Sequence, residues 1–441
     1  MGVPVRRRPL PRGRPLTQAA WFYPLALAVP FLIGIAVLKG LTVEIDTFHG
    51  SDARIYQLPT IRQFARQLPG VDLGDYPAAQ TPLFHLVMAV WGKVVGFEPW
   101  RLRLLNVAFS YLAVLALFRL LWRQLGVGRT QAFALALVFA LSPYFFGASF
   151  AVLTDNLALL FGVLAVGWFL RARREGALAP FALGCAAMAG AVLTRQSFLW
   201  LAPIAAWALL PWPLTRRKLA GALMVLAALS PFAALVIDWG ALVPPGSDPA
   251  SCGLCQDRAG LRRSGLTLRS VLFTVSLVGL YAAAIWGPGL LRRARELRPR
   301  FSLVVLSLVG GGALLAVSQL AYRPATSEHG ADAGYLWKLS DQLPEPGGSS
   351  LLFWALVPLG AVALALLLSR VGIDSLPTVF LAGFLLAAVP VGLVYQKYFD
   401  PYVLWALAML ARPADLRVRA DYAGLALLAA AFVAYALSFA G

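Results

Sequence analysis

Acidic side chains concentrate in the first long polar segment of the chain, residues 44–80. The segment follows the first hydrophobic run, and acids beside a membrane span cost solvation free energy unless they have partners or a task. A carboxylate there could be a general base that takes the proton of an acceptor hydroxyl, so we expect this segment to form the catalytic loop. Its acids and its histidine are Glu44, Asp46, His49, Asp52, Asp72 and Asp75.

Asp46 is our first candidate for the base, and the alternative is a solvated acid or helix cap after the first span. Asp52 is the second candidate, with an ion pair to the nearby Arg54 as the alternative. His49 has two equal interpretations. It could donate to a phosphate or orient Asp46, or it could be an ordinary polar group at a membrane interface.

Two further charged residues stand at the ends of hydrophobic runs. Arg195 lies between two short apolar runs, where a guanidinium could hold a lipid phosphate through two hydrogen bonds. The alternative for Arg195 is a side chain that simply extends to the interface. Asp155 follows Thr154 at the start of a run, where capping of a helix competes with a catalytic role. Weaker cations for the same anion are His329, Lys338 and Lys397.

The composition places these residues in a membrane protein. The chain has 441 residues, of which 60% are hydrophobic and 13% charged, and its mean hydropathy is +0.73. Too few polar residues remain to cover a soluble domain, so we expect an all-α polytopic membrane protein. About thirteen apolar runs have the length of a span, among them 131–147 and 402–411, the latter being the least secure. The run 82–96 is expected to lie in the outer interface as a helix.

Charge supports one orientation of these spans, because cytoplasmic loops concentrate Lys and Arg. With the N-terminus inside, the inner segments hold 23 of the 38 basic and five of the 20 acidic residues, which places the whole net charge of +18 on one face. This basic cytoplasmic face explains the charge without nucleic acid as a partner. We expect a basic cytoplasmic tail at 1–20, followed by a single transmembrane domain at 21–441. Three outer loops are expected within that domain, at 39–103, 243–267 and 322–350.

The long polar loops all lie outside, so the chemistry is expected there. No phosphate-binding glycine motif opens a helix on the inner side, which argues against nucleotide-driven transport. An enzyme on the outer face needs an activated substrate that crosses the membrane, and lipid-phosphate sugars are the common kind.

Cys252 and Cys255 lie on an outer loop, where an oxidising compartment favours a disulfide. A single CxxC lacks the second ligand pair of a zinc site.

Five short motifs occur in an order that resembles the GT-C superfamily of polyprenyl-phosphate-sugar glycosyltransferases. Within it, the motifs are most similar to those of the dolichyl-phosphate-glucose-dependent α-1,2-glucosyltransferase family, which adds the last glucose to the lipid-linked N-glycan precursor. The matching segments are Asp46-Thr47-Phe48-His49, Pro143 through Thr154-Asp155, Arg195-Gln196-Ser197, Glu328-His329 through Tyr335-Leu336-Trp337-Lys338, and Tyr398-Phe399-Asp400-Pro401-Tyr402.

The resemblance implies a GT-C fold and transfer of a hexose, with glucose first, from a polyprenyl-phosphate donor to a glycan or lipid-linked acceptor. It implies inversion at the sugar carbon, a carboxylate base and donor-phosphate binding by Arg195 with Gln196. One departure bears on the base, because the family has two adjacent acids where this chain has Ile45 and Asp46. That loss makes a divalent metal site at Glu44, Asp46 and Asp155 less favoured than direct base catalysis, and no cofactor is expected.

Two alternatives remain open at the level of the sequence. A transporter or flippase of a lipid-linked substrate would also be polytopic, although transporters place ionisable groups at midspan and the runs here are nearly uncharged. Other members of the GT-C superfamily transfer mannose, arabinose or galacturonate. The abundance of Ala, Leu, Arg and Gly points to a bacterial protein, so we expect the inner membrane of a bacterial cell with the active site facing outwards.

Overall fold

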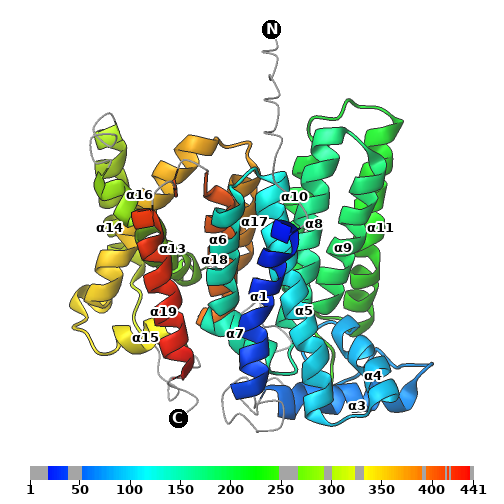
Figure 1. Cartoon of the computed structure of the whole chain (residues 1–441). Helices are drawn as coiled ribbons and strands as arrows, with labels where there is room; N and C mark the ends of the chain where they lie inside the picture. Colours follow the sequence, from blue (N-terminus) through cyan, green and yellow to red (C-terminus); the bar gives the residue numbers. More distant parts are fainter. Residues whose placement is uncertain are drawn as a thin grey trace.

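The computed structural model describes residues 18–37, 52–247, 267–292, 300–322, 332–389, 394–412, 415–416 and 419–437. Within these ranges the chain is helical, and its only β-type pairing is an isolated bridge between Ala333 and Tyr395. The expected all-α architecture is confirmed. The helices stand side by side as an upright bundle, with shorter helices at its lower end (Figure 1).

In the N-terminal half, α8 occupies the centre, because it packs against α5 on one side and α9 on the other. Gly176 ends α8 in a left-handed conformation (φ +60°) that a residue without a side chain adopts readily. The elements of this half are α1 (Gln18–Val37), η1 (Ala53–Gln57), α3 (Leu58–Gln67), α4 (Leu83–Val95), α5 (Pro99–Arg119), η2 (Leu120–Gln124), α6 (Arg129–Leu141), α7 (Pro143–Ser149), α8 (Asp155–Glu175), α9 (Leu178–Thr194), η3 (Gln196–Leu201), α10 (Ala202–Leu209) and α11 (Arg216–Trp239).

In the C-terminal half, α16 packs against both α13 and α14, and α13 also contacts α18 and α19. Most side chains of α11 and α14 are exposed, as expected for helices on the lipid-facing surface of a membrane protein. The elements of this half are α13 (Arg269–Arg292), α14 (Phe301–Ser318), α15 (Tyr335–Ser340), η5 (Pro346–Gly348), α16 (Leu351–Val371), α17 (Leu376–Ala388), η6 (Gln396–Tyr398), α18 (Asp400–Leu410), η7 (Arg419–Tyr422) and α19 (Ala423–Leu437).

The described residues contain six helices long and apolar enough to cross a membrane, or seven if the bent pair α6 and α7 is one span. Six shorter apolar helices accompany them, so the expected count of thirteen spans is not confirmed. The expectation of a span at 402–411 is wrong, because α18 has 11 residues, and about 16 Å of helix does not reach across a hydrocarbon core. Instead, α18 is enclosed by the rest of the bundle.

The expected span at 131–147 is broken in the middle. α6 and α7 meet at an angle of 69°, and the break falls at Ser142, directly before Pro143. A residue that precedes proline is biased away from helical geometry, and Ser142 has the extended ψ of 127° that this bias favours. Pro143 then begins α7, where its missing N–H costs nothing. The bend brings Ser142 into the interior, where its side chain is fully buried.

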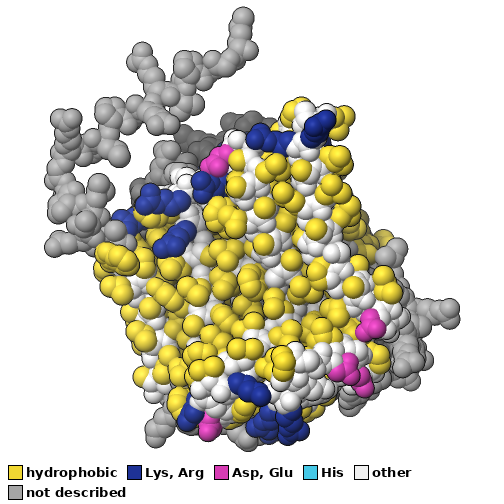
Figure 2. Space-filling view, turned by 90° about the vertical axis from the view of Figure 1, so that its right-hand side faces the viewer, with side chains coloured by type: hydrophobic (Ala, Val, Ile, Leu, Met, Phe, Trp, Pro, Cys, Tyr) yellow, Lys and Arg dark blue, Asp and Glu magenta, His cyan; other side chains and the backbone are white. Residues whose placement is uncertain are grey.

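The first polar loop contains two helices at the lower end of the bundle, α3 and α4, and α3 runs across the view (Figure 1). α3 buries one face, including Ile61 and Phe64, while Arg62 and Arg66 are exposed, which is the pattern of an amphipathic helix. α4 coincides with the run 82–96 that was expected to form an interfacial helix. Figure 2 shows a hydrophobic band across the middle of one face, with Lys and Arg side chains gathered near its upper and lower edges.

Candidate functional site

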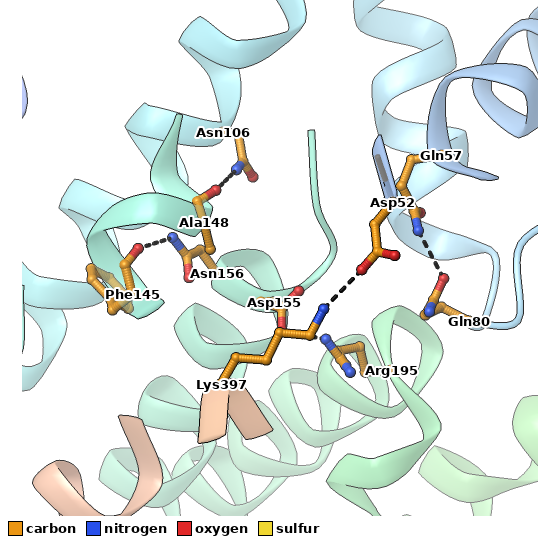
Figure 3. A network of polar contacts seen from close by, with 10 residues as sticks. All are labelled: Asp52, Gln57, Gln80, Asn106, Phe145, Ala148, Asp155, Asn156, Arg195 and Lys397. Carbon is orange, nitrogen blue, oxygen red and sulfur yellow. Dashed lines mark hydrogen bonds and ion pairs between the residues drawn. The ribbon is translucent and has the colours of Figure 1, made fainter. Parts of the chain in front are cut away.

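Four charged residues from four separate segments form two ion pairs in one region (Figure 3). Lys397 Nζ donates to Asp52 Oδ2 at 2.8 Å, across 345 residues of sequence. Arg195 Nη1 donates to Asp155 Oδ1. Because each pair joins elements that are distant in the sequence, the arrangement depends on the folded bundle.

Each of the four residues stands at the end of a helix. Asp52 precedes η1 and α3 in the first polar loop. Asp155 is the first residue of α8, where the helix dipole favours a negative charge. Arg195 follows α9 with an extended backbone, and Lys397 lies in the single turn η6 before α18.

Tyr398 connects the two ion pairs. The guanidinium carbon of Arg195 lies 5.2 Å from the centroid of its ring, and Lys397 Nζ lies 5.1 Å from the same centroid. Cations at such distances are attracted to the ring by its quadrupole, and the attraction is stronger where water is excluded. Two cations are therefore held around one aromatic ring, which favours a site for an anion.

The cations are more enclosed than the acids. The side chains of Lys397 and Arg195 are 8% and 14% exposed, against 25% and 21% for Asp52 and Asp155. Burial alone would lower the pKa of Lys397, but the neighbouring tyrosine and the two carboxylates raise it above its ordinary value. Burial likewise lowers the pKa of Arg195, but the carboxylate of Asp155 raises it, and the net pKa lies above its ordinary value. Both side chains are therefore cationic at neutral pH.

The alternatives raised by the sequence can now be compared with these contacts. Asp52 was expected either to act as a base or to pair with Arg54, and its carboxylate accepts from Lys397. Capping was the alternative for Asp155. The preceding Thr154 is the N-cap residue of α8 without a side-chain cap bond, and the Asp155 carboxylate accepts from Arg195.

Gln196 holds the backbone of two loops beside the ion pairs. Its Nε2 donates to the carbonyl oxygen of Ala79 at 2.7 Å and to that of Leu242 at 3.4 Å. In the first loop, Gln57 Nε2 donates to Gln80 Oε1 at 3.0 Å, and Gln57 Oε1 is 2.7 Å from the Nε2 of the fully buried His85. These amides fix residues 57–80 against η3, so Gln196 orders the loop that carries Asp52.

A second polar cluster surrounds the buried carboxylate of Asp400, and sequence reasoning did not select it. Ser142 Oγ donates to Asp400 Oδ2 at 2.5 Å. Gln396 Nε2 donates to Oδ1 at 3.2 Å, and the hydroxyls of Tyr281 and Tyr335 donate to the same oxygen. The only signal in the sequence was the presence of Asp400 between Phe399 and Pro401. Since Gln396 and Asp400 flank Lys397, this cluster fixes the turn that presents the lysine.

The late outer loop approaches the same turn. The backbone N–H of Gln396 donates to the carbonyl oxygen of Ala333 at 2.8 Å, and Gln396 Oε1 accepts from the N–H of Leu336 at 2.9 Å. Lys338 is an exposed residue of α15 in this loop.

The structure thus brings Asp52, Asp155, Arg195 and Lys397 together, with Gln196 as a support. The other proposed site residues lie outside the described residues: Asp46, His49, Cys252, Cys255 and His329.

Asp52 and Asp155 offer carboxylate oxygens, but each is paired with a cation. The described part of the chain contains no group of three His, Cys, Asp or Glu side chains placed to hold a metal ion. Glu44 and Asp46 lie outside that part, so direct base catalysis without a metal stays a prediction.

One family model matches part of the chain. Residues 79–237 are similar to the family described as dolichyl-phosphate-mannose-protein mannosyltransferase. The match includes Asp155 and Arg195 but covers less than half of the chain. It is a different family from the glucosyltransferase family that the motifs resemble, so the assignment to that family stays a prediction. No curated protein matches the chain significantly.

Solved structures match the chain over most of its length, at low sequence identity. ArnT from Cupriavidus metallidurans in the apo state is 14% identical, with a TM-score of 0.39, over 93% of this chain and 78% of that chain. ArnT bound to undecaprenyl phosphate is 15% identical, with a TM-score of 0.44, over 96% and 72%. The arabinosyltransferase EmbB from Mycobacterium smegmatis is 15% identical, with a TM-score of 0.37, over 99% and 42%. Likenesses at this level carry no argument about function.

Proposed function

We propose that this protein is a membrane glycosyltransferase of the GT-C type, which transfers a sugar from a polyprenyl-phosphate donor to a hydroxyl of a glycan or lipid-linked acceptor. The observation that carries the proposal is the pair of enclosed cations, Arg195 and Lys397, held around Tyr398 at helix ends. The partial match to a family of dolichyl-phosphate-sugar enzymes supports it, because Arg195 and Asp155 lie within the matched residues.

The chemistry follows from the charges. The acceptor oxygen attacks the anomeric carbon, the bond from that carbon to the phosphate oxygen breaks, and polyprenyl phosphate leaves with the extra negative charge. Arg195 and Lys397 would stabilise that charge, as cations fixed in a site of restricted water do. A carboxylate takes the proton of the acceptor hydroxyl. With attack from the face opposite the phosphate, the configuration at the sugar carbon is inverted.

The carboxylates of the two ion pairs prepare the cations in this scheme. Before the donor binds, Asp52 and Asp155 keep the two cations oriented and compensated, so the cations need no reorganisation when the phosphate arrives. Asp46 remains our first candidate for the base, because Asp52 would have to leave Lys397 before it could take a proton. We infer that the site lies on the outer face of the membrane, because the basic residues of the loops are concentrated on the other, cytoplasmic face.

Two sugars deserve testing first. Glucose follows from the motifs that resemble the α-1,2-glucosyltransferase family. Mannose is the second candidate, since the family matched at residues 79–237 is described as a mannosyltransferase. A transporter or flippase is the other class of function. It is less favoured, because the family matched at residues 79–237 is described as a transferase.

Purified protein in liposomes tests the proposal. It would be supplied in parallel with polyprenyl-phosphate glucose, mannose and arabinose and with glycolipid extract from a deletion strain as acceptor. We expect mass spectrometry to detect one sugar added to an acceptor, with release of polyprenyl phosphate. Movement of intact lipid-linked sugar between leaflets without any bond being broken would instead establish the flippase. Absence of both activities with all donors would reject the proposed donor class.

A further inference from the structure

A close helix crossing lies within the C-terminal half, near the middle of α13 and α16. α13 and α16 meet at Gly279 and Gly360. A methyl group at Gly279 would clash with the carbonyl of Leu356, and one at Gly360 would clash with the carbonyl of Val275. Small residues allow membrane helices to approach until their backbones touch. The two helices are therefore closest at these glycines, and the distance between them increases away from this contact.

Beyond the crossing, a cleft opens between the two helices. Its walls are apolar and carry small side chains, and its lining includes Ala282, Ala283, Trp286, Ala363, Leu367 and Arg370. Ala283 is exposed, so the cleft is accessible from the surface. An apolar cleft on the surface of a membrane helix bundle is suited to a hydrocarbon chain rather than to water.

Trp286, which lines the cleft, has an unsatisfied hydrogen-bond donor. The residue is 5% exposed, and its indole N–H is buried without a hydrogen-bond acceptor in the structure. An unpaired buried donor costs free energy, so such a group commonly has a partner that is bound from outside. A lipid ester or phosphate oxygen at the cleft would supply the missing acceptor.

Three arginines gather around the end of the cleft. Arg370 lines the cleft and its Nη1 lies 3.3 Å from Asp415 Oδ1. Arg412 donates from Nη2 to the carbonyl oxygen of Arg370, and from its backbone N–H to Asp415 Oδ2 at 3.0 Å. Arg300 Nη1 lies 3.3 Å from Ser369 Oγ. Asp415 therefore compensates the Arg370 guanidinium, whereas the guanidinium groups of Arg300 and Arg412 donate to neutral oxygens.

The end of the cleft near Arg370 lies far from the ion pairs of Arg195 and Lys397. Arg173, near the C-terminal end of α8, donates to Asp374 at 2.7 Å, and Asp374 follows α16 by three residues. Asp155 stands at the other end of α8, which has 21 residues and is therefore about 30 Å long. The cleft with Arg370 at its end thus belongs to the opposite membrane face and is not part of the proposed catalytic site.

We propose that this cleft binds an anionic phospholipid, with one acyl chain between α13 and α16 and the phosphate among Arg300, Arg370 and Arg412. The apolar lining suits the acyl chain, and the guanidinium groups of Arg300 and Arg412, which donate to neutral oxygens, suit the anionic head group. The unpaired N–H of Trp286 suits an acceptor near the glycerol. Arginine suits a lipid phosphate because its planar fork donates two parallel hydrogen bonds. The ligand would be a structural lipid of the leaflet opposite the catalytic site.

The test uses full-length protein in phosphatidylcholine nanodiscs containing a trace of phosphatidylglycerol with a photoactivatable group in one acyl chain. After irradiation, peptide mass spectrometry locates the label. We expect labelling at residues 282–287 and 359–370, with unlabelled phosphatidylglycerol competing better than phosphatidylcholine. Each arginine near a membrane surface is worth about a fivefold preference for anionic lipid, so Arg370→Gln should weaken competition by phosphatidylglycerol about fivefold.

Two further variants keep the outcome decisive. Ala283→Phe fills the cleft without changing charge and should abolish labelling there. Arg171→Gln removes an exposed arginine from the same membrane face, where it pairs with Glu175, and should leave labelling unchanged. Equal competition by both phospholipids would reduce the cleft to ordinary lipid contact and overturn the proposal. Stronger competition by polyprenyl phosphate than by phosphatidylglycerol would also overturn it, since the cleft would then belong to the donor lipid.

Discussion

Arg195 and Lys397 differ in what they can offer a phosphate. A guanidinium donates two parallel hydrogen bonds to phosphate oxygens, whereas an ammonium acts as a compact charge. Both are anchored in the same way, because each faces one carboxylate and the ring of Tyr398. We therefore expect Arg195 to orient the donor and Lys397 mainly to supply charge.

Arg195 provides the first prediction. Arg195→Ala should raise the KM for the polyprenyl-phosphate donor and also lower kcat, because the guanidinium would contact the phosphate both before and during bond cleavage. Arg195→Lys should restore part of kcat but little of the donor affinity, since the charge returns without the fork. Steady-state kinetics in liposomes distinguishes the two effects. Arg66→Ala on the exposed side of α3 serves as control, and a KM unchanged in Arg195→Ala would contradict the role.

The identity of the base gives the second prediction. Asp46→Asn should lower turnover by about 10²-fold to 10⁴-fold, as for other positioned bases, with donor binding retained. Asp52→Asn should lower turnover less, because Asp52 serves as the partner of Lys397. Single-turnover rates with bound donor measure the chemical step directly. A nearly normal rate for Asp46→Asn beside an inactive Asp52→Asn would assign the base to Asp52.

The sequence indicates which residues could act better than it indicates which of them contact one another in the fold. Arg195 and Asp52 stand out as candidates because charged residues are rare in an apolar chain. Lys397 was ranked low, since nothing in its local sequence reveals that Asp52, 345 residues away, will face it. Asp400 was quoted only as part of a motif. Its importance depends on burial and on donors such as Ser142, which reach it through tertiary packing alone.

At the scale of elements, the short helices and turns between the spans position the site. The segment 332–336 is tied to the turn of Lys397 through backbone contacts with Gln396. Its other anchor is a buried ion pair, in which Asp332 Oδ2 accepts from Arg269 Nη2 at 2.5 Å. Asp332 Oδ1 also accepts from the N–H of Val394 at 3.2 Å. Asp332 therefore joins the start of α13 to the segment that leads to Lys397.

The third prediction tests this anchor. Asp332→Asn should lower the free energy of unfolding by about 3 kcal/mol, because removing one partner leaves a buried guanidinium uncompensated. Thermal unfolding in detergent should show a lower Tm. The matched control Glu345→Gln alters an exposed acid in the same region and should leave Tm within about 1 °C. An unchanged Tm for Asp332→Asn would show that the pair contributes little.

The breaks in the helices were the part of the fold that hydropathy did not predict. A hydropathy run averages over Ser142 and Pro143, so 131–147 reads as one span although α6 and α7 are bent by 69°. The run at 402–411 is apolar because α18 is enclosed by protein, and burial in protein and burial in lipid require the same side chains. The helix α4 coincides with the expected run 82–96, while its placement in the outer interface stays a prediction that rests on charge.

For the whole molecule, the charge asymmetry predicts an orientation, which places the ion pairs on the outer face and Glu175 inside. The fourth prediction uses single cysteines at Arg66 and Glu175 in a variant whose three natural cysteines are replaced by serine. In intact cells with a permeabilised outer membrane, a membrane-impermeant maleimide should label position 66 and not position 175. The reverse pattern would invert the topology and move the proposed site to the cytoplasmic face.

Binding of the lipid phosphate by the cation pair is the central claim, and the affinity for polyprenyl monophosphate tests it without knowledge of the sugar or the acceptor. Lys397→Ala removes a charged donor, so the Kd measured in detergent should rise about tenfold or more relative to the unaltered protein. Lys93→Ala, which removes an exposed lysine of α4, should leave Kd unchanged. A correctly folded Lys397→Ala variant that binds polyprenyl phosphate as tightly as the unaltered protein would contradict the account.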